Sequence, residues 1–357
     1  MRFMVTGGSG FIGSSFLYQF APVYSENVFI NVDRLTYAAN PLSLSAIESV
    51  DNYVFEHVDI ADRRAVEDLL DRQRPDVVVH FAAESHVDRS LTGPSEFVTT
   101  NINGTFNLLE GCRRVWGRDL ESRRFHHVST DEVYGELGSD GKFREDTPYC
   151  PSSPYSATKA GSDHLVRAYH RSYGLPITIT NCSNNYGPRQ FPEKLIPLMI
   201  LNAIEGKPLP VYGNGSNVRD WLHVEDHCRA IWRVVEKGVP GETYNVGGNC
   251  ELTNLEVVRA ICRAVANETG VDEQQVPDLV TFVTDRPGHD FRYAIDASKI
   301  ADELNWEPEW DFESGLRATV RWYLENAGWV GAARSQCYEN WIEENYGQRG
   351  EEGPRAS

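Results

Sequence analysis

Strand-like runs alternate with helical stretches through the first half of this sequence, and this alternation limits the possible folds most strongly. The strand-like runs are nearly continuous in Val, Ile and Phe and cover residues 2–7, 27–33, 53–60, 76–83, 125–130 and 176–182. Helical patterns occupy residues 11–20, 61–73, 94–115 and 155–174. Parallel strands that are covered on both faces by crossover helices produce this alternation. The sequence therefore predicts an α/β fold built on a doubly wound parallel sheet.

A second, smaller and irregular α/β unit is expected after about residue 183, where the alternation gives way to segments rich in Pro and Gly. Residues 242–248 (ETYNVGG) nevertheless resemble one more strand of the first sheet, so the boundary between the units is discontinuous. We expect a first domain of residues 1–183 and about 225–250, and a second of about 184–224 and 251–345. Residues 346–357 are expected to form a frayed tail.

Charge and hydropathy exclude several classes of partner. The net charge of −18 disfavours nonspecific binding to nucleic acid or to an anionic membrane. No apolar run reaches about 18 residues, and the start MRFMVTGG lacks the hydrophobic region of a signal peptide, which indicates a cytoplasmic protein. The seven cysteines form no C-x-x-C pair, so we expect neither a disulfide framework nor a metal site.

Lysine is scarce in this chain, because only six of the 34 basic residues are Lys and the remaining 28 are Arg. An acidic, Lys-poor surface suits high internal salt, since strong screening removes the repulsion between carboxylates. A halophilic source is one hypothesis. Codon bias in a GC-rich genome is the other, and the sequence leaves both open.

The glycines of GGSGFIG, residues 7–13, directly follow the first predicted strand and begin the first predicted helix. Gly7, Gly10 and Gly13, with Phe11 and Ile12 between the last two, would let the backbone approach a pyrophosphate. The helix N-terminus adds unpaired N–H donors and a positive dipole end. A tight strand-to-helix turn has the same spacing, so this motif needs support from other residues.

Asp33 gives that support. It ends the second predicted strand, twenty residues after Gly13, where a carboxylate can accept hydrogen bonds from both ribose hydroxyls of a dinucleotide. The combination is typical of a Rossmann sheet that binds NAD, because Asp33 would repel the 2′-phosphate of NADP. Arg34 is the contrary observation, since its side chain could pair with such a phosphate.

Other strands end at the same edge of the sheet, where ligands of doubly wound sheets bind. The third and fourth predicted strands end in HVDI and FAAES. We assign Asp59 and Ile60 to the adenine of the cofactor, and Ala82 and Ala83 to contacts through the backbone.

The fifth predicted strand ends in Thr130, Asp131 and Glu132, and the next predicted helix begins with YSATK. Tyr155 and Lys159 are spaced i, i+4, so they share one helix face. A nearby ammonium favours the phenolate and is expected to lower the tyrosine pKa, which makes Tyr155 a base for a substrate hydroxyl. Without the dinucleotide site, the same residues would fit a solvated helix face and a solvated strand end.

GGSGFIG, STDEVYG and YSATK, in this order, resemble the motifs of the extended short-chain dehydrogenase/reductase family of nucleotide-sugar enzymes. The stretches NVDRLTYAAN, AAESHVDRS, NNYGPRQFPEKLIP, NGSNVRDWLHVEDH and DRPGHDFRYAID are similar to the branch of this family that dehydrates the sugar. The resemblance extends from residue 1 to about residue 325. It implies an NAD-dependent lyase that acts on a nucleotide-linked glucose. Whether the base is thymine, uracil or cytosine stays open.

The resemblance also implies a role for the adjacent carboxylates. Oxidation of the sugar at C4 needs Tyr155, Lys159 and Thr130, whereas removal of water across C5 and C6 needs more. Glu132 is implied as the base that takes the C5 proton, and protonated Asp131 as the acid for the departing C6 hydroxyl. Adjacent carboxylates tend to hold one proton between them, so acid and base are supplied together.

Further binding residues are implied by the same resemblance. The sugar and diphosphate contacts are Ser85, Thr130, Asn184, Lys194 and Leu195, the diphosphate is bound by Arg219 and Arg286, the nucleotide pocket includes Asn254 and His289, and the cofactor has Thr100 and Asn185 as additional neighbours. A surface ion pair is the alternative for each arginine. Helices near 94–116 and 155–173 imply a homodimer with a four-helix contact, and packing against their own sheet is the alternative.

Two other functions fit part of the sequence. UDP-sugar epimerases and UDP-glucuronate decarboxylases of the same superfamily commonly lack an Asp at the position of Asp131. A catalytically silent NAD sensor on this fold would have no need of Tyr155, Lys159 and the two carboxylates.

Overall fold

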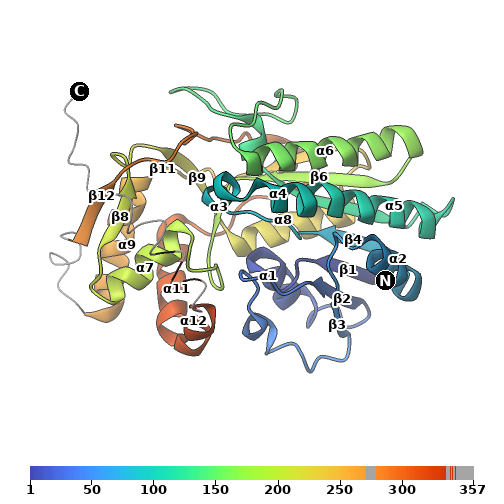
Figure 1. Cartoon of the computed structure of the whole chain (residues 1–357), viewed down its shortest axis with the longest axis horizontal. Coiled ribbons are helices and arrows are strands. Elements are labelled where there is room, and N and C mark those ends of the chain that lie inside the picture. The colour runs from blue at the N-terminus through green and yellow to red at the C-terminus, as the bar shows by residue number, and fades with distance from the viewer. Residues whose placement is uncertain (271–278, 335–337, 339, 341, 343–357) are drawn as a thin grey trace.

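The structure is a computed structural model that describes residues 1–270 and 279–334 together with residues 338, 340 and 342. Figure 1 shows a larger lobe built around a sheet and a smaller lobe that contains most of the C-terminal helices. The predicted tail, residues 346–357, lies outside the described residues.

Seven parallel strands form the sheet of the larger lobe, in the order β10-β6-β5-β4-β1-β2-β3. These strands are β1 (Arg2–Thr6), β2 (Val28–Asp33), β3 (Tyr53–His57), β4 (Val77–His80), β5 (Arg124–Thr130), β6 (Ile177–Cys182) and β10 (Thr243–Val246). The central strands are buried along almost their whole length, as expected for a sheet covered on both faces. The predicted doubly wound parallel sheet is confirmed, including the late strand within ETYNVGG.

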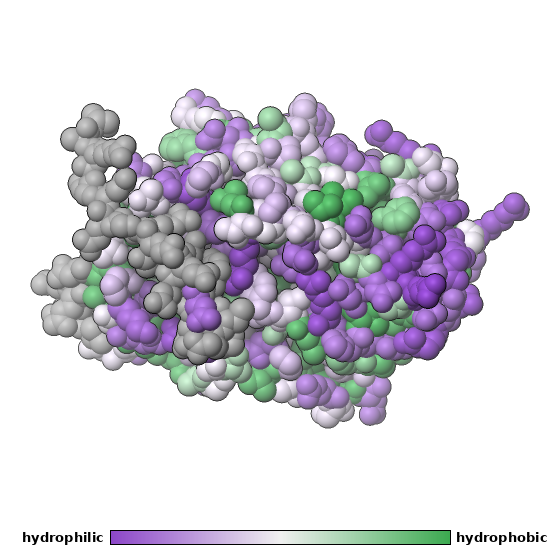
Figure 2. All heavy atoms as spheres, viewed as in Figure 1, coloured by the Kyte–Doolittle hydropathy of each residue, from purple (hydrophilic) through white to green (hydrophobic). Residues whose placement is uncertain are grey.

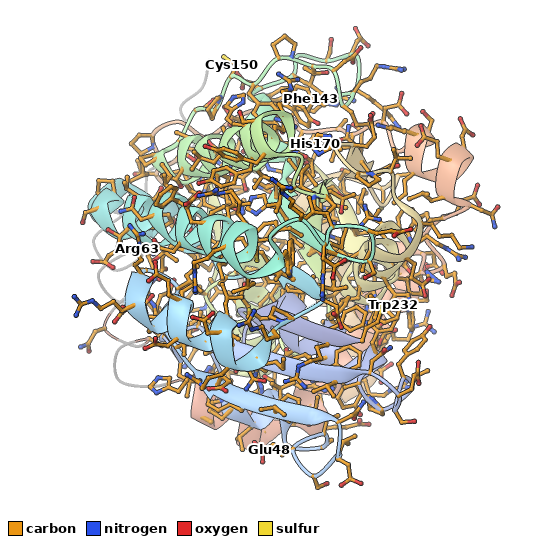
Figure 3. All side chains as sticks on the ribbon, turned by 90° about the vertical axis from the view of Figure 1, so that its right-hand side faces the viewer. Glu48, Arg63, Phe143, Cys150, His170 and Trp232 are labelled. Atoms are coloured by element: carbon orange, nitrogen blue, oxygen red, sulfur yellow. The ribbon has the colours of Figure 1, made fainter. Side chains whose placement is uncertain are left out.

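Helices cover both faces of this sheet. One face carries α1 (Phe11–Phe20) and α8 (Val224–Lys237), and the other carries α2 (Arg63–Gln73), α5 (Thr105–Trp116) and α6 (Pro154–Tyr173). Trp232 of α8, labelled in Figure 3, stacks on Phe20 of α1 with ring centroids 4.5 Å apart, and on Phe3 of β1 at 5.3 Å. Aromatic pairs of this kind contribute about 0.5–1.5 kcal/mol beyond their buried area.

The predicted helix 94–115 is continuous but not uniform. It consists of α4 (Pro94–Phe97), a π-helical segment η2 (Val98–Gly104) and α5, and the short helix α3 (Val87–Thr92) precedes it. Within η2, Asn101 donates to the Glu84 carbonyl over 3.0 Å and accepts from the Glu84 amide over 2.9 Å. It also donates to the Thr158 hydroxyl over 2.9 Å. The π-helical turn therefore connects the loop after β4 to α6.

The smaller lobe has two short sheets and its own hydrophobic core. One sheet is made of β7 (Asn184–Tyr186), β9 (Val218–His223) and β11 (Glu251–Thr253), and the other of β8 (Leu209–Tyr212) and β12 (Val280–Val283). The core lies among α7 (Leu195–Ile204), α9 (Asn254–Thr269), α11 (Phe312–Glu325) and α12 (Ala327–Ala333), and α10 (Ser298–Leu304) packs near β10. This is the irregular α/β unit expected after residue 183. The exact domain boundaries stay a prediction.

The connections of the large sheet diverge between β1 and β4. The chain continues from β1 toward β2 on one side and from β4 toward β5 on the other. The last residues of these strands, Thr6 and His80, lie side by side, with Thr6 Oγ1 and His80 Nδ1 2.7 Å apart. Ligands of open α/β sheets bind beside such a point, at the carboxyl ends of the strands.

Candidate active site

The turn between β1 and α1 leaves no room for a side chain at Gly7 or at Gly13. Gly7 has a φ of +73°, and a Cβ atom there would lie 2.6 Å from the Ala82 amide nitrogen. A Cβ at Gly13 would lie 2.3 Å from the Gly7 carbonyl oxygen. Only glycine fits these two positions, so the backbone itself forms this side of the crevice.

The N-terminus of α1 begins at this turn and lacks a side-chain cap. Gly10 is the N-cap residue and makes no side-chain hydrogen bond, and no acidic residue occupies the first turn of the helix. Unpaired N–H groups and the positive dipole end make such a terminus a binding site for an anionic group. This observation fits the pyrophosphate of a dinucleotide.

Asp33 ends β2 next to that turn. Its Oδ2 accepts a hydrogen bond from the Ser9 amide over 2.9 Å, and its Oδ1 accepts one from the Leu35 amide over 2.8 Å. Each carboxylate oxygen can accept a further hydrogen bond, as two ribose hydroxyls would require. The side chain also fixes the loops on both sides of it, a structural role that the sequence did not predict.

Arg34 does not offer a free cation to a 2′-phosphate. Its guanidinium pairs with Asp59 over 3.2 Å and with Glu84 over 2.8 Å. Because both of these carboxylates and Asp33 repel an additional phosphate, the crevice fits NAD better than NADP. Because Arg34 is paired with two carboxylates, it gives no support for binding of NADP.

The carboxyl pair (Asp131 and Glu132) follows the end of β5 in a short 3₁₀ turn, η3 (Asp131–Tyr134). Asp131 is 1% exposed, and its Oδ1 accepts a hydrogen bond from the Thr130 hydroxyl over 3.3 Å. Its Oδ2 is buried and has no hydrogen-bond partner among the described residues. A buried carboxyl with one oxygen unpaired is poorly solvated as an anion.

The two carboxyls differ in their electrostatic surroundings. Burial raises the pKa of Asp131 well above its usual value, and the negative charges of Glu132 and Asp220 raise it further. Burial also raises the pKa of Glu132, but the cations Arg286, Arg219 and Lys194 oppose this increase. The surroundings therefore favour a proton on Asp131 more strongly than on Glu132, as a pair of an acid and a base requires.

Tyr155 and Lys159 lie on the first turns of α6, which begins with a capping box between Ser153 and Ser156. Lys159 is buried and donates from Nζ to the Val128 carbonyl over 2.8 Å. The capped start of the helix fixes both side chains against the end of β5.

The expected lowering of the Tyr155 pKa is wrong for this arrangement of groups. Burial raises that pKa well above its usual value, and the negative charge of Glu132 raises it further, while a hydrogen bond with Thr130 opposes the increase. Desolvation of the phenolate is the largest of these effects. A cationic group bound beside the phenol would be needed to reverse the direction.

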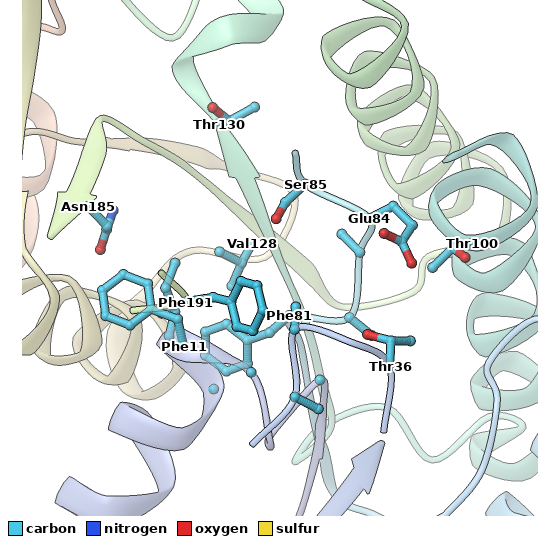
Figure 4. A pocket seen from close by; sticks show the side chains of 18 of the residues that line it. Phe11, Thr36, Phe81, Glu84, Ser85, Thr100, Val128, Thr130, Asn185 and Phe191 are labelled. Carbon is cyan, nitrogen blue, oxygen red and sulfur yellow. The ribbon is translucent and has the colours of Figure 1, made fainter. Parts of the chain in front are cut away.

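One cavity gathers these elements at the carboxyl edge of the sheet. Figure 4 shows Thr130 at the end of β5, with Ser85 and Thr100 on one side and Asn185 on the other. The side-chain oxygens of Thr100 and Asn184 are buried without a partner among the described residues. The predicted residues that line this cavity are Gly7, Gly10, Phe11, Ile12, Gly13, Asp33, Asp59, Ile60, Ala82, Ala83, Ser85, Thr100, Thr130, Asp131, Glu132, Tyr155, Lys159, Asn184, Asn185 and Lys194.

Comparison with known proteins identifies the family. The family model for GDP-mannose 4,6 dehydratase matches residues 4–319. The dTDP-glucose 4,6-dehydratase 1 of Escherichia coli K12 is 53% identical over 359 residues, which cover 97% of this chain and 99% of the relative. The chain belongs to the dTDP-glucose 4,6-dehydratase family. Another such dehydratase, from Neisseria meningitidis serogroup B, is 56% identical over 336 residues, or 92% of this chain and 94% of the relative.

Solved structures separate the fold from the chemistry. DesIV, a dTDP-glucose 4,6-dehydratase from Streptomyces venezuelae solved with NAD and TYD bound, is 46% identical with a TM-score of 0.86, covering 94% of this chain and 100% of DesIV. The UDP-glucose 4-epimerase of Thermus thermophilus, solved with NAD, is 28% identical with a TM-score of 0.81, covering 91% of this chain and 100% of the epimerase. Dehydratases and epimerases share this fold, so individual residues must distinguish them.

Five of the residues predicted to bind the substrate do not line this cavity. Arg219, Arg286 and His289 lie beyond it. Both arginines oppose the raised pKa of Glu132, and burial together with their charges lowers the pKa of His289 to about 4. Leu195 is the first residue of α7, and Asn254 begins α9, where its amide donates to the Asn217 carbonyl over 2.9 Å.

Neither arginine is a surface ion pair. Arg219 is 5% exposed, donates to the carbonyls of Val218 and Asp290, and lies 4.2 Å from the centre of the Tyr293 ring. Arg286 pairs with the buried Asp88 over 3.3 Å. A buried guanidinium with an aromatic face below it is fixed in place, which suits recognition of an anion.

The sequence missed several residues that line the cavity of this family member. Glu84 follows β4 and holds Arg34, while Cys182 and Ser183 follow the rule for strand ends, because β6 ends at Cys182. The same rule that identified Asp59 and Asp131 could have found these two residues.

None of the helices in the described ranges is both long and apolar enough to cross a membrane.

Proposed function

We propose that this chain is a dTDP-glucose 4,6-dehydratase that works with NAD bound in the crevice at the carboxyl edge of the large sheet. The observation that carries the proposal is the carboxyl pair, a buried Asp131 with a raised pKa next to Glu132 on the cavity wall. Oxidation or epimerisation at C4 needs no buried acid beside the base, whereas elimination of water does. The relatives named as dTDP-glucose 4,6-dehydratases support the choice of substrate.

The first proposed step oxidises the sugar at C4. Bound NAD would supply the hydride acceptor for this step and the hydride donor for the last one. Tyr155 takes the proton of the C4 hydroxyl, with the Thr130 hydroxyl beside it to orient the substrate. Lys159 is buried next to this group and favours the phenolate.

The second proposed step removes water. The C4 ketone acidifies the C5 proton, which Glu132 takes, and Asp131 gives its proton to the C6 hydroxyl, which leaves as water. In the last step Glu132 returns a proton to C5 while hydride is delivered to C6. Because the hydride taken from C4 is returned at C6, the cycle ends with no net change in the cofactor. The proton gained by Tyr155 balances the one lost from Asp131.

The substrate is proposed to lie between the two lobes. Lys194 donates from Nζ to the Ser85 carbonyl over 2.9 Å, which brings two predicted sugar contacts together. Arg219 and Arg286 are proposed to bind the diphosphate, and Asn254 and His289 the nucleotide. The proposed division at about residues 184–224 and 251–345 assigns Lys194 and both arginines to the second domain.

We further propose that the enzyme is a cytoplasmic homodimer that associates through α5, α6 and the segment before them. Val98, Phe106 and Tyr173 are large hydrophobic side chains that are 45%, 38% and 54% exposed on these elements. Figure 2 shows hydrophobic atoms over the region of α4 and α5. Light scattering would test the dimer, and Phe106→Glu should shift the protein toward the monomer.

A panel of nucleotide sugars tests the proposed activity. The protein is incubated with dTDP-, UDP- and CDP-glucose, and the products are analysed by mass spectrometry. Loss of one water, fastest from dTDP-glucose, is the expected result. A product of unchanged mass but altered C4 configuration would assign the chain to the epimerases instead.

A further inference from the structure

A buried carboxylate, Asp163, extends the catalytic face of α6 by one more turn. Tyr155, Lys159 and Asp163 follow each other at intervals of four residues, so these three residues, the α6 stripe, lie on one face of the helix. Lys159 is 4% exposed and Asp163 is 0% exposed. The proposed reaction gives Asp163 no role, although burying a charged group is costly unless it is paired.

The α6 stripe packs along β5. Lys159 Nζ donates to the Val128 carbonyl over 2.8 Å. The next residue of the strand, Ser129, donates its hydroxyl to Asp163 Oδ2 over 2.9 Å, and the Tyr149 hydroxyl donates to the same oxygen over 2.8 Å. The ammonium and the carboxylate are thus held against neighbouring residues of one strand.

Most of the titratable groups around the α6 stripe are neutral at pH 7. On the sheet, burial lowers the pKa of His127 to about 4 and that of His80 well below its usual value. Burial raises the pKa of the Cys182 thiol on β6 and of the Tyr149 phenol in the loop before α6. As a neutral ring, His127 can donate from Nε2 to Asp163 Oδ1, which lies 3.2 Å away.

Asp163 is the carboxylate whose surroundings favour its charge. Burial alone would raise its pKa, but the hydrogen bond with His127 and the charges of Lys159 and Arg167 hold it below the usual value. The carboxyl pair, in contrast, has raised pKa values, and its negative charges raise the pKa of Tyr155. Burial lowers the pKa of Lys159, and the negative charge of Asp163 is the largest effect that opposes this decrease.

We propose that Asp163 is a positioning residue for the reaction, whose carboxylate is the counter-charge that keeps Lys159 an ammonium group beside Tyr155. An ammonium stabilises the phenolate, and a neutral amine does not. The inference rests on the proposed function, because it specifies how the base for the C4 hydroxyl is kept ready. Asp163 itself touches neither the substrate nor the reacting atoms.

Asp163→Asn removes the charge and can keep the contacts. The amide oxygen of Asn can accept the hydrogen bonds from Ser129 and Tyr149, and its NH₂ group can donate to His127 Nε2. This requires the ring proton to move to His127 Nδ1, which has no partner among the described residues and is free to carry it. Tyr149→Phe is the control, because it removes one hydrogen bond to Asp163, and with it the hydrogen bonds that Arg167 and Asn181 donate to the same hydroxyl, but leaves the charge of Asp163.

The scarcity of lysine makes the decisive measurement practical. Protein grown with ¹³C-labelled lysine has only six lysine Cε signals, and Lys159→Met identifies the one from Lys159. In the wild type this signal should be that of an ammonium at pH 7. In Asp163→Asn its titration midpoint should fall by about one to three pH units, the usual effect of losing an opposite charge nearby. In Tyr149→Phe it should stay within a few tenths of a unit.

The pH profile of kcat/KM for dehydration gives a second readout. Its alkaline limb should move to lower pH in Asp163→Asn by the same amount, whereas a purely structural defect would lower activity equally at every pH. A Lys159 signal that titrates alike in wild type and Asp163→Asn overturns the inference, and so does a neutral Lys159 in the wild type at pH 7, even if no variant folds. The nuclear magnetic resonance titration needs no turnover, so a failure of the proposed function alone would leave it intact.

Discussion

The backbone amide of Ser9 donates a hydrogen bond to Asp33 Oδ2 over 2.9 Å, so the glycine turn after β1 is tied to the end of β2. A second hydrogen bond, from the Leu35 amide to Oδ1, ties the following loop to the same carboxylate. Any change at Asp33 therefore acts on two loops as well as on a bound ribose.

Asp33→Ala should reduce the NAD content of the purified protein, because it removes the proposed acceptor of both ribose hydroxyls and leaves two amides unpaired. Loss of about 1.5–3 kcal/mol for hydrogen bonds to a charged group corresponds to roughly 10- to 150-fold weaker binding. Asp33→Asn, which keeps one acceptor oxygen, should lose less. Cofactor content measured after gel filtration checks both variants, and equal content in all three proteins would remove the ribose role.

Asp131→Asn should separate oxidation from elimination. The variant keeps Tyr155 and Lys159, so C4 oxidation continues, but it lacks the acid for the C6 hydroxyl, which slows elimination by roughly 10²–10⁴. Absorbance of reduced nicotinamide should therefore build up when substrate is added, with little loss of water. Tyr155→Phe is the control and should show no such increase. Elimination at the wild-type rate in Asp131→Asn would refute the acid role.

The same variant should be more stable than the wild type at pH 7. Asp131 holds its proton more tightly in the folded than in the unfolded protein. Its contribution to the free energy of unfolding is therefore fully present below the unfolded pKa of about 3.8 and is lost as the pH rises through the raised folded pKa. Each pH unit between these two pKa values lowers the free energy of unfolding by about 1.4 kcal/mol. Asn is neutral throughout and avoids this loss.

Melting curves from pH 4 to 8 test this, and the gap between Asp131→Asn and wild type should widen with pH. Asp140→Asn, a change at an exposed carboxylate, should follow the wild type. A constant gap across the pH range would mean that the Asp131 carboxyl is not desolvated in the folded protein.

Gly13→Ala should damage the cofactor turn, because its Cβ would lie 2.3 Å from the Gly7 carbonyl oxygen. Overpacking of this kind costs about 1–3 kcal/mol, and loss of bound NAD should accompany the lower melting temperature. Gly328→Ala is the matched control in α12, where a Cβ has nothing within 4 Å. That change should be neutral or stabilise by about 0.5–1 kcal/mol.

Salt distinguishes the two explanations of the acidic, Lys-poor composition. If the chain comes from a halophile, its melting temperature should rise between about 0.1 M and 1 M salt, where the Debye length falls to about 3 Å and carboxylate repulsion is screened. Codon bias in a GC-rich genome predicts a flat curve. A melting temperature that is unchanged or lower at 1 M salt would favour codon bias.

The sequence predicted the residues that lie at strand ends, because strand runs and their final residues can be read from a single chain. Asp33, Asp59 and Asp131 were found in this way, and the structure brings all three to one cavity. Cys182 obeys the same rule and was overlooked, since a cysteine in a strand is more often read as part of the core.

Properties that depend on tertiary packing could not be predicted from the sequence. Within the π-helical turn, the Asn101 side chain binds Glu84 and Thr158, and both partners are distant in the chain. The direction of the Tyr155 pKa depends on desolvation, which the i, i+4 spacing to Lys159 does not reveal. The contacts of Arg34 with two carboxylates likewise required the assembled loops.

The seventh strand of the large sheet has a consequence for synthesis of the chain. Thr243 of β10 pairs with Ile179 of β6, so the edge of β6 gains its partner only after the first strands of the smaller lobe have been made. During translation this edge presents unpaired N–H and C=O groups, which are prone to join other growing chains. The last strand of the sheet is therefore added late. Translation pauses or truncations before residue 246 should favour aggregation over an independently folded N-terminal half.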